Sequence, residues 1–358
     1  MTAPPTFPLT IVRSEELVPG FRRITFAPQP GLRYEAGQFI TFVHTISGQE
    51  LRRSYSLLSV PGLDAAPAIG VRRIDNGLFS RYLFDHATPG TVLRCTGAAG
   101  LFRLPPGSGP QQLFFLAAGS GITPIWALLR AVLHRHPQWS AVLVYSSHDP
   151  ATAILRKELV ELAKQFAGRF HLHPLYSTDP QLRRARLNRD GLLGLLRLEG
   201  AGPERTWFYC CGPDSYMRFC TFVLREAGIP AARIRREDFI PSPAPVPQLA
   251  PPDTAPQEVR LYWQGRGWRF TVRWPDSILR GAQHLGLELP YSCAAGRCAS
   301  CVATCLEGRT WMARNEVLTA ADLAHGLTLT CTAYPDRGPV TLRLDDTPTD
   351  APLTDLGA

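Results

Sequence analysis

The sequence predicts a multidomain fold: an antiparallel β-barrel, then an α/β domain built on a parallel sheet, then a small cysteine-rich domain. Its 358 residues are enough for two or three domains of ordinary size. From Gln111 the apolar pattern changes from short alternating runs to an alternation of strands and helices. Seven prolines in the sixteen residues from Pro241 to Pro256 then separate the cysteine-rich end from the rest.

Residues 1–108 are predicted to form the barrel, because short strands alternate there with turn signals at close spacing. The predicted strands are Phe21–Phe26, Gln38–His44, Arg53–Val60, Ala68–Ile74 and Thr91–Thr96.

Residues 109–240 show the alternation that is typical of a doubly wound parallel sheet. The predicted strands are Leu113–Ala118, Ala141–Tyr145 and Trp207–Cys211, and the predicted helices are Pro124–His134, Ile154–Phe166 and Tyr216–Glu226.

The prolines predict a semi-rigid, extended linker over residues 241–257. In residues 258–358, the segments Glu258–Gln264 and Arg269–Val272 have the pattern of a hairpin. A helix over Ser277–Leu285 and a cysteine-rich loop follow.

The net charge of +8 is unevenly distributed. From Glu258 onward ten arginines face eleven acidic residues, so the preceding part carries +9. The cations are scattered, apart from one run between Arg183 and Arg189, whereas nucleic-acid-binding proteins concentrate them with aromatic residues. We therefore expect no nucleic-acid partner, and a surface that attracts anionic cofactors.

Membrane insertion is not expected either. The most apolar run, Leu113 to Leu129, is interrupted by Gly119, Gly121 and Pro124. The first ten residues lack the pattern of a secretory signal, which predicts a cytoplasmic location. In that reducing compartment, nine cysteines indicate metal binding or redox chemistry rather than disulfides.

Four cysteines carry the most specific pattern. Cys293, Cys298, Cys301 and Cys331 are separated by four, two and twenty-nine residues, the spacing of plant-type [2Fe–2S] ligands, in which each pair of thiolates completes the coordination of one iron. Gly296 suits a loop that curls around such a cluster. The alternatives are a zinc site, which usually needs two close cysteine pairs, and unrelated core cysteines. Cys305 is interpreted as a buried apolar side chain rather than a spare ligand.

The residues around these cysteines resemble the ferredoxin domain of flavin-dependent oxygenase reductases, which implies a β-grasp-like [2Fe–2S] fold. The matching residues are Pro290, Tyr291, Ser292, Gly308, Met312, Asn315, Leu318, Leu329 and Thr330. The sequence departs at Ala299, where many relatives have glycine.

The order of barrel, nucleotide fold and cluster domain resembles the ferredoxin-NADP⁺ reductase superfamily. By this resemblance Arg53 pairs with the flavin phosphate, Tyr55 packs on the flavin, and Ser56 points to the N5 end of the ring; a guanidinium and an aromatic ring suit these roles. On its own, this segment is only a polar patch on a strand.

A second matching segment comprises Val71, Arg72, Gly77, Phe79 and Ser80 and implies the rest of the flavin site. Ser80 would bond a pyrophosphate at the start of a helix over Ser80–Phe84. A pyrophosphate site favours FAD, with FMN as the alternative.

Gly119, Gly121, Thr123 and Pro124 follow an apolar strand and open a helix. Glycines at such a turn expose backbone N–H groups to a pyrophosphate, and proline suits the first helical turn. The resemblance implies a nicotinamide nucleotide here, with Thr123 near its ring.

The partner segment is Cys211, Gly212 and Pro213, which by resemblance places the thiol beside the hydride-transferring carbon. A thiol packed in the core is the alternative. Glu237 and Phe239 match an acidic and aromatic pair near the flavin, although Phe239 could also be core filling.

The choice between NADPH and NADH depends on the end of the second nucleotide-fold strand. Ser146, Ser147 and Arg156 favour the 2′-phosphate of NADPH, whereas Asp149 suits the free ribose hydroxyl of NADH.

These parts predict an oxidoreductase in which electrons pass from NAD(P)H through FAD and a [2Fe–2S] cluster to a partner, because a flavin connects two-electron and one-electron carriers. The resemblance implies that the partner is a di-iron or Rieske oxygenase. The alternatives are a reductase for a hybrid-cluster or other redox protein, and a redox-sensing flavin module.

Overall fold

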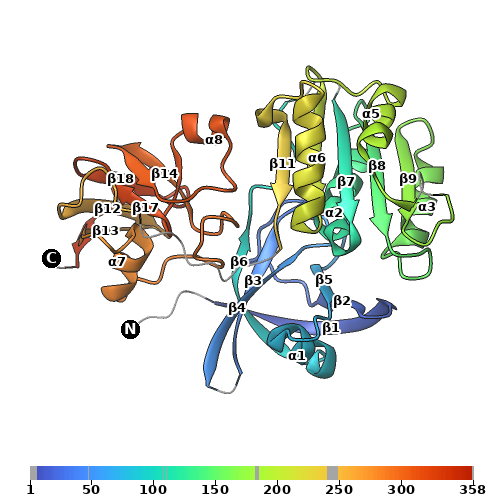
Figure 1. Ribbon diagram of the computed structural model, residues 1–358. Helices are drawn as coiled ribbons and strands as arrows, with labels where there is room; N and C mark the ends of the chain where they lie inside the picture. Colours follow the sequence, from blue (N-terminus) through green and yellow to red (C-terminus); the bar gives the residue numbers. More distant parts are fainter. Residues whose placement is uncertain are drawn as a thin grey trace. The chain divides into compact units, whose positions relative to one another are not determined.

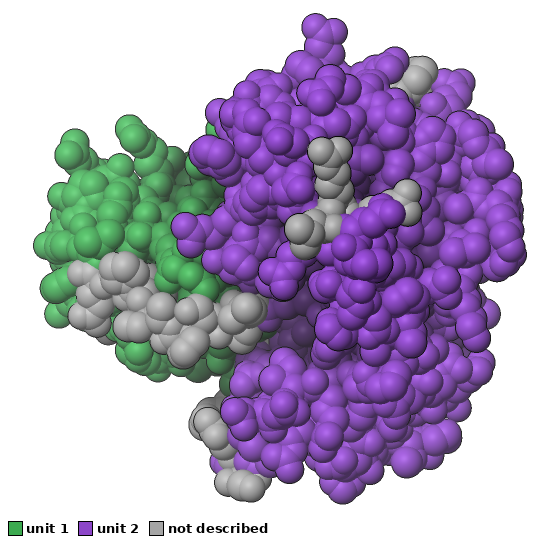
Figure 2. Space-filling view, turned by 45° about the vertical axis from the view of Figure 1, so that its right-hand side comes forward, with its two compact units in different colours: residues 1–5, 240–358 green, residues 6–239 purple. Residues whose placement is uncertain are grey.

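The computed structural model describes residues 6–46, 48–107, 109, 111–181, 185–239 and 249–356. The chain divides into two compact units, residues 6–239 in one and residues 1–5 with 240–358 in the other (Figure 2). Residues 241–248 of the predicted linker, and Arg183 and Arg184 of the arginine run, lie outside the described residues. Residues 249–256 form neither helix nor strand.

The first part of the larger unit is a six-stranded antiparallel barrel with the strand order β4-β3-β6-β1-β2-β5 (Figure 1). A bridge between Leu57 and Ile69 joins the two ends of the sheet. Helix α1 (Leu78–His86) contributes Phe79 and Leu83 to the core inside the barrel. The strands are β1 (Phe7–Val18), β2 (Phe21–Phe26), β3 (Phe39–Ile46), β4 (Gln49–Ser56), β5 (Ala68–Arg72) and β6 (Val92–Ala99).

The second part is a five-stranded parallel sheet with the order β11-β10-β7-β8-β9. Successive side chains along each strand point to opposite faces of the sheet. On β7, Leu113 and Phe115 pack with α2 and α3, and Phe114 and Leu116 pack with α5 and α6. The strands are β7 (Gln112–Ala118), β8 (Ser140–Ser147), β9 (Phe170–Tyr176), β10 (Thr206–Cys211) and β11 (Ile234–Glu237). The helices are α2 (Ile122–Arg135), α3 (Arg156–Gln165), α5 (Arg189–Leu198) and α6 (Asp214–Glu226), with the 3-10 turns η1 (Gly119–Gly121) and η2 (Ala231–Arg233).

The smaller unit is a six-stranded mixed sheet with the order β16-β14-β18-β12-β13-β19. Parallel pairing of β12 with β18, next to the antiparallel β12–β13 hairpin, is the arrangement that the β-grasp expectation requires. The strands are β12 (Gln257–Trp263), β13 (Arg266–Val272), β14 (Val302–Glu307), β16 (Leu327–Leu329), β18 (Val340–Arg343) and β19 (Leu353–Asp355). A separate pair joins β15 (Thr310–Met312) to β17 (Ala333–Pro335), and the helices are α7 (Ile278–His284) and α8 (Ala320–Ala324).

The structure confirms the predicted fold class of all three domains, and several element boundaries differ. The predicted helix Ser80–Phe84 begins two residues earlier, at Leu78, and the strand predicted over Arg53–Val60 ends at Ser56. Sequence reasoning missed β1, since only Leu9 and Ile11 on this strand are buried. It missed α5 for the same reason, because only Leu192 and Leu196 of this helix are buried. No helix in the described part of the chain is long and apolar enough to cross a membrane.

Candidate functional site

The order of the parallel sheet reverses between β7 and β10, and ligands of such sheets bind beyond the strand ends at this point. The Gly119–Gly121 turn follows β7, and Gly212 and Pro213 follow β10. The two loops are in close contact. A Cβ built on Gly121 would lie 2.1 Å from the carbonyl oxygen of Cys211. Only glycine at this position allows the loops to meet.

Thr123 lies where helix α2 meets the barrel. Its side chain is buried, and its hydroxyl donates a 2.9 Å hydrogen bond to the carbonyl of Ser120. On the barrel side, a Cβ on Gly70 would lie 2.7 Å from Thr123 Cγ2. Sequence reasoning missed Gly70, although an isolated glycine inside a strand signals a close approach. Pro124, also buried, occupies the first turn of α2 as expected.

Tyr145 was not predicted as a site residue. At the end of β8 this buried side chain donates a 3.2 Å hydrogen bond to the carbonyl of Gly119, and so stabilises the conformation of the glycine turn. Arg72 of the barrel is close enough to influence the Tyr145 hydroxyl electrostatically, although burial dominates and raises its pKa. No pattern in the sequence distinguishes this tyrosine from a core residue.

The predicted flavin residues gather on β4, β5 and α1. The ring of Tyr55, only partly covered, lies 6.0 Å from that of Phe79, centroid to centroid. Arg53 is exposed, and its guanidinium donates to the carbonyl of Arg52 at 2.8 Å. Arg72 is also exposed, whereas the side chain of Val71 is buried in the barrel core and leaves only its backbone for a ligand.

The start of α1 differs from the expectation for Ser80. The N-cap residue is Gly77, and the Ser80 hydroxyl lies inside the first turn. It donates to the carbonyl of Gly77 at 3.2 Å and accepts from the backbone N–H of Ile74 at 3.2 Å. This hydroxyl therefore shapes the loop before the helix, and the free N–H groups of the first turn are the available phosphate donors.

Ser56 joins the flavin strand to the nucleotide sheet. Its buried hydroxyl donates a 3.2 Å hydrogen bond to Glu237 Oε2. Glu237 is paired with Cys211 in the register of β10 and β11, so hydroxyl, carboxyl and thiol converge. Burial raises the pKa of Cys211 well above its ordinary value, which keeps the thiol protonated. Phe239 is 39% exposed and is therefore not core filling.

Glu237 has an unusual proton affinity for a carboxyl group. Burial raises its pKa to about 8, against the opposing effect of the Ser56 hydrogen bond. The folded protein therefore holds a proton at neutral pH that the unfolded chain releases above its ordinary pKa of 4.5. The stability linked to this proton is complete below pH 4.5 and is lost as the pH rises through 8.

We expect Glu237→Gln, which mimics the protonated carboxyl, to flatten the dependence of unfolding free energy on pH between about 5 and 8. Urea unfolding of the holoprotein at several pH values measures this slope. Glu204→Gln, at an exposed glutamate of the same domain, serves as the control and should retain the wild-type slope. A wild-type slope in Glu237→Gln would show that the carboxyl is ionised in the folded state.

The residues predicted to choose the nucleotide lie at the end of β8 and the start of α3. The buried hydroxyl oxygen of Ser147 has no hydrogen-bond partner among the described residues, and Ser146 faces the buried hydroxyl of Tyr216. Arg156 is exposed at the first position of α3. The carboxylate of Asp149 accepts the backbone N–H groups of Ala151 at 2.7 Å and Thr152 at 2.9 Å, which lowers its pKa. Asp149 thus stabilises its own turn.

In the smaller unit the four predicted cysteine ligands lie as two pairs, and among the described residues no three ligating side chains are grouped around the position of a single metal ion. The thiols of Cys293 and Cys298 are neighbours, and so are those of Cys301 and Cys331. The N–H of Thr330 donates to the carbonyl of Cys301 at 3.1 Å, which holds the turn after β16 against the loop. Cys305 is half-buried, not fully buried as predicted, because it lies toward the exposed end of β14, where its thiol donates to the carbonyl of Glu307.

The loop backbone is shaped as a cradle. Gly296 has φ +72°, and a Cβ there would lie 2.6 Å from the carbonyl oxygen of Arg314. The N–H of Ala295 points at the sulfur of Cys293 at 3.4 Å. Ala299, where relatives often have glycine, has φ +55° and so adopts the left-handed region in which alanine is strained. Two thiol pairs with N–H groups aimed at sulfur fit a [2Fe–2S] cluster.

Known protein families match each of the three parts. An oxidoreductase FAD-binding domain matches residues 8–104, an oxidoreductase NAD-binding domain matches 115–221, and a 2Fe-2S iron-sulfur cluster binding domain matches 261–336. A component of the 1,2-phenylacetyl-CoA epoxidase of Escherichia coli K12 is 30% identical over 94% of this chain and 97% of its own. The chain belongs to the ferredoxin-NADP⁺ reductase superfamily. Within it, this chain is an oxygenase reductase with a C-terminal [2Fe–2S] domain.

Further relatives of this oxygenase reductase agree. The ferredoxin reductase component of 3-ketosteroid-9-alpha-monooxygenase from Rhodococcus rhodochrous is 30% identical over 91% of this chain and 93% of its own. Phthalate dioxygenase reductase has the same fold, with a TM-score of 0.55 at 22% identity over 95% of this chain and 98% of its own. The protein is thus an oxidoreductase that transfers electrons from NAD(P)H through FAD and a [2Fe–2S] cluster to an oxygenase partner.

Proposed function

We propose that NADPH is the electron donor and that the residues converging on the ends of β4, β7 and β10 form the site of its oxidation. The hydrogen bond between Ser56 and Glu237 carries the placement of this site, because it joins the flavin strand directly to the end of the nucleotide sheet. The flavin, when bound, supplies the exchange between two-electron and one-electron chemistry. We assign Ser56, Cys211 and Phe239 to the reacting end of the flavin.

Binding of FAD is assigned to two groups on the barrel. Arg53 supplies an exposed guanidinium for the phosphate, and Tyr55 and Phe79 supply the aromatic wall. Gly77 and the N–H groups after it supply donors for the pyrophosphate. The remaining barrel residues of this assignment are Val71, through its backbone, Arg72, and Ser80, through the loop that its hydroxyl shapes.

Binding of the nicotinamide nucleotide is assigned to the facing loops. Gly119, Gly121 and Gly212 expose the backbone to the pyrophosphate, while Thr123 and Cys211 flank the ring. The loop geometry depends on Pro124 and Pro213 at the starts of α2 and α6. Burial keeps the Cys211 thiol protonated, so it acts by packing and polarity and not as a nucleophile.

The preference for NADPH is assigned to Ser146, Ser147 and Arg156. The orphaned hydroxyl of Ser147 needs a hydrogen-bond partner, and a guanidinium at a helix start suits a phosphate. The acid that would select NADH, Asp149, is occupied by the N–H groups of its own turn. All three facts favour a phosphorylated ribose.

We expect Arg156→Ala to weaken NADPH binding by about 10-fold or more, because a charge-assisted contact is lost, and to leave NADH binding within about twofold. Anaerobic absorbance titrations with each nucleotide measure both affinities and follow flavin and cluster reduction together. Arg197→Ala, at an exposed arginine on α5, is the control. Equal losses of affinity for NADPH and NADH in Arg156→Ala would contradict the assignment. So would reduction of the wild-type protein by NADH at a lower concentration than NADPH requires.

For the smaller unit we propose that Cys293, Cys298, Cys301 and Cys331 hold the cluster and that the acceptor is a di-iron or Rieske oxygenase. We also propose a cytoplasmic location and domain boundaries near residues 108, 240 and 257. The Escherichia coli and Rhodococcus relatives, named as parts of an epoxidase and a monooxygenase, support an oxygenase acceptor over the hybrid-cluster and sensor alternatives.

A further inference from the structure

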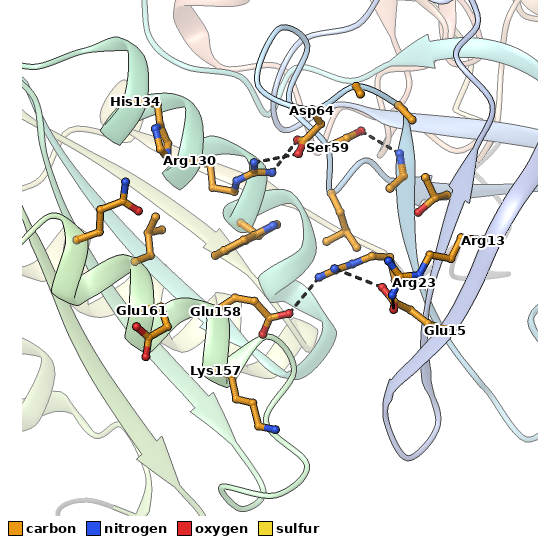
Figure 3. Close-up of a pocket in the computed structure, with 18 residues that line it drawn as sticks. Arg13, Glu15, Arg23, Ser59, Asp64, Arg130, His134, Lys157, Glu158 and Glu161 are labelled. Carbon is orange, nitrogen blue, oxygen red and sulfur yellow. Dashed lines mark hydrogen bonds and ion pairs between the residues drawn. The ribbon is translucent and has the colours of Figure 1, made fainter.

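A cleft of about 740 Å³ lies between the barrel and the helices α2 and α3 (Figure 3). Its walls combine apolar side chains, such as Leu58 and Trp126, with charged side chains of both signs. The cleft is lined by none of the residues assigned above to FAD or NADPH. Its charged residues therefore have another role.

Two ion pairs cross this cleft and connect the barrel to the nucleotide domain. Arg130 of α2 donates to both carboxylate oxygens of Asp64, at 2.7 and 2.9 Å. Arg23 of β2 donates to Glu158 of α3 through one contact at 3.2 Å. A two-contact arginine–carboxylate pair fixes direction as well as distance, whereas a single contact leaves rotation free. The Arg130–Asp64 pair is therefore the more rigid of the two.

The partners of Arg130 and Asp64 are themselves held in place. Asp64 Oδ2 also accepts the backbone N–H of Val60 at 2.7 Å, so the carboxylate belongs to the loop that continues directly from Ser56. The Arg130 guanidinium lies 5.5 Å from the centre of the Trp126 ring. Each member of the pair is therefore held by a second contact of its own.

Helix α2 packs on the barrel through an apolar core, in which Leu128 lies beside Gly37, and two further contacts lie along the same side of the helix. Thr123 packs on Gly70 at the beginning of the helix, and Arg130 pairs with Asp64 seven residues later, on the same side and about 10 Å along the axis. Among these contacts the Arg130–Asp64 pair is the most directional, because two parallel hydrogen bonds fix orientation as well as distance, whereas apolar packing permits small shifts. The Gly119–Thr123 segment is rigidly continuous with this helix.

We propose that Arg130 and Asp64 are positioning residues for hydride transfer, because their pair sets the angle of α2 against the strand that ends at Ser56. This inference rests on the proposed function of Ser56 and Thr123. The step moves one proton and two electrons from the nicotinamide ring to the flavin, so the nucleotide is oxidised and the flavin reduced. A misplacement of about 1 Å slows such a step by about 100-fold.

An ion pair across an open cleft contributes little to the free energy of unfolding. The transfer rate and the melting temperature therefore distinguish a positioning role from a merely structural one. A positioning pair changes the transfer rate far more than the melting temperature, and a structural pair does the reverse.

The test uses the holoprotein with Arg130→Met, which keeps an apolar stem beside Trp126 and removes the two hydrogen bonds. We expect flavin reduction at saturating NADPH to slow by about 10- to 100-fold while nucleotide affinity changes less than about threefold. The kinetic isotope effect with deuterated nucleotide should become more temperature-dependent. The long-wavelength absorbance that reports stacking of the two rings should weaken, a readout that does not depend on turnover.

Arg23→Met is the matched control, because it removes the ion pair to Glu158 of α3 from the same cleft and leaves α2 and β4 unchanged. It should retain the wild-type rate within about twofold. Asp64→Asn, which keeps an acceptor for Val60, should reproduce the effect of Arg130→Met and gives a second route if that variant does not fold.

Three results would overturn the positioning role: wild-type rate and ring-stacking absorbance in Arg130→Met, the same in Asp64→Asn, or an equal loss of rate in Arg23→Met. A wild-type protein whose flavin neither nucleotide reduces would overturn the proposed function itself, and with it this inference. The two failures are therefore distinguishable in one series of measurements.

Discussion

Replacing Cys331 by serine is expected to abolish the [2Fe–2S] cluster while the flavin domain keeps working. The thiol of Cys331 adjoins that of Cys301. Serine has no sulfur, and its hydroxyl stays protonated at neutral pH, so it cannot replace the thiolate ligand. Changes outside the ligand shell already cost about 10- to 100-fold, so we expect cytochrome c reduction to fall by about 100-fold or more. Electron paramagnetic resonance of the dithionite-reduced protein measures the cluster directly.

Ferricyanide reduction, which needs only the flavin, should stay within about twofold of wild type and shows that the larger unit is intact. Cys305→Ser is the matched control, since this thiol lies on β14 four residues beyond Cys301 and donates to the backbone of Glu307. It should keep the full cluster signal. A cluster that survives in Cys331→Ser and disappears in Cys305→Ser would reassign the fourth ligand.

Replacing Gly121 by alanine is expected to separate the two nucleotide loops. The added Cβ would lie 2.1 Å from the carbonyl oxygen of Cys211 and 2.7 Å from the backbone nitrogen of Gly212. Backbone atoms cannot turn aside as a side chain can, so β7 and β10 must move apart at their ends. We expect a loss of about 1–3 kcal/mol in unfolding free energy and at least about 10-fold weaker nucleotide binding.

The comparison for this variant is Gly119→Asn, in the same turn. Gly119 has φ +55° and open space around its Cβ position, and asparagine tolerates this conformation. Chemical unfolding should therefore place Gly119→Asn within about 1 kcal/mol of wild type. If Gly121→Ala were equally stable and bound NADPH normally, the close contact between the loops would not exist in solution.

The cysteine set was recognisable in the sequence because three of its members lie within nine residues of one another. Short spacing along a loop restricts which atoms the chain can bring together, so the pattern survives without knowledge of the rest of the fold. The departure at Ala299 was visible in the sequence, but its φ of +55° is a property of the folded loop and could be known only from the structure.

Strand and helix patterns located most elements for a similar reason, since buried faces impose a period on the sequence. This signal fails where an element buries little. In β1 two residues are buried, and α5 likewise buries only two, so neither shows a sustained period. The early start of α1 also followed from a local contact, the Ser80 hydroxyl inside the first turn.

By itself, the sequence determined the family, the order of the three domains and the cysteines that come together, all of which depend on patterns within short segments. Only the tertiary structure decided that Ser56 meets Glu237, 181 residues away, and that Asp64 meets Arg130. Such contacts depend on how separate elements pack and on the register of β10 with β11. Packing is a property of the whole chain, so no local pattern encodes it.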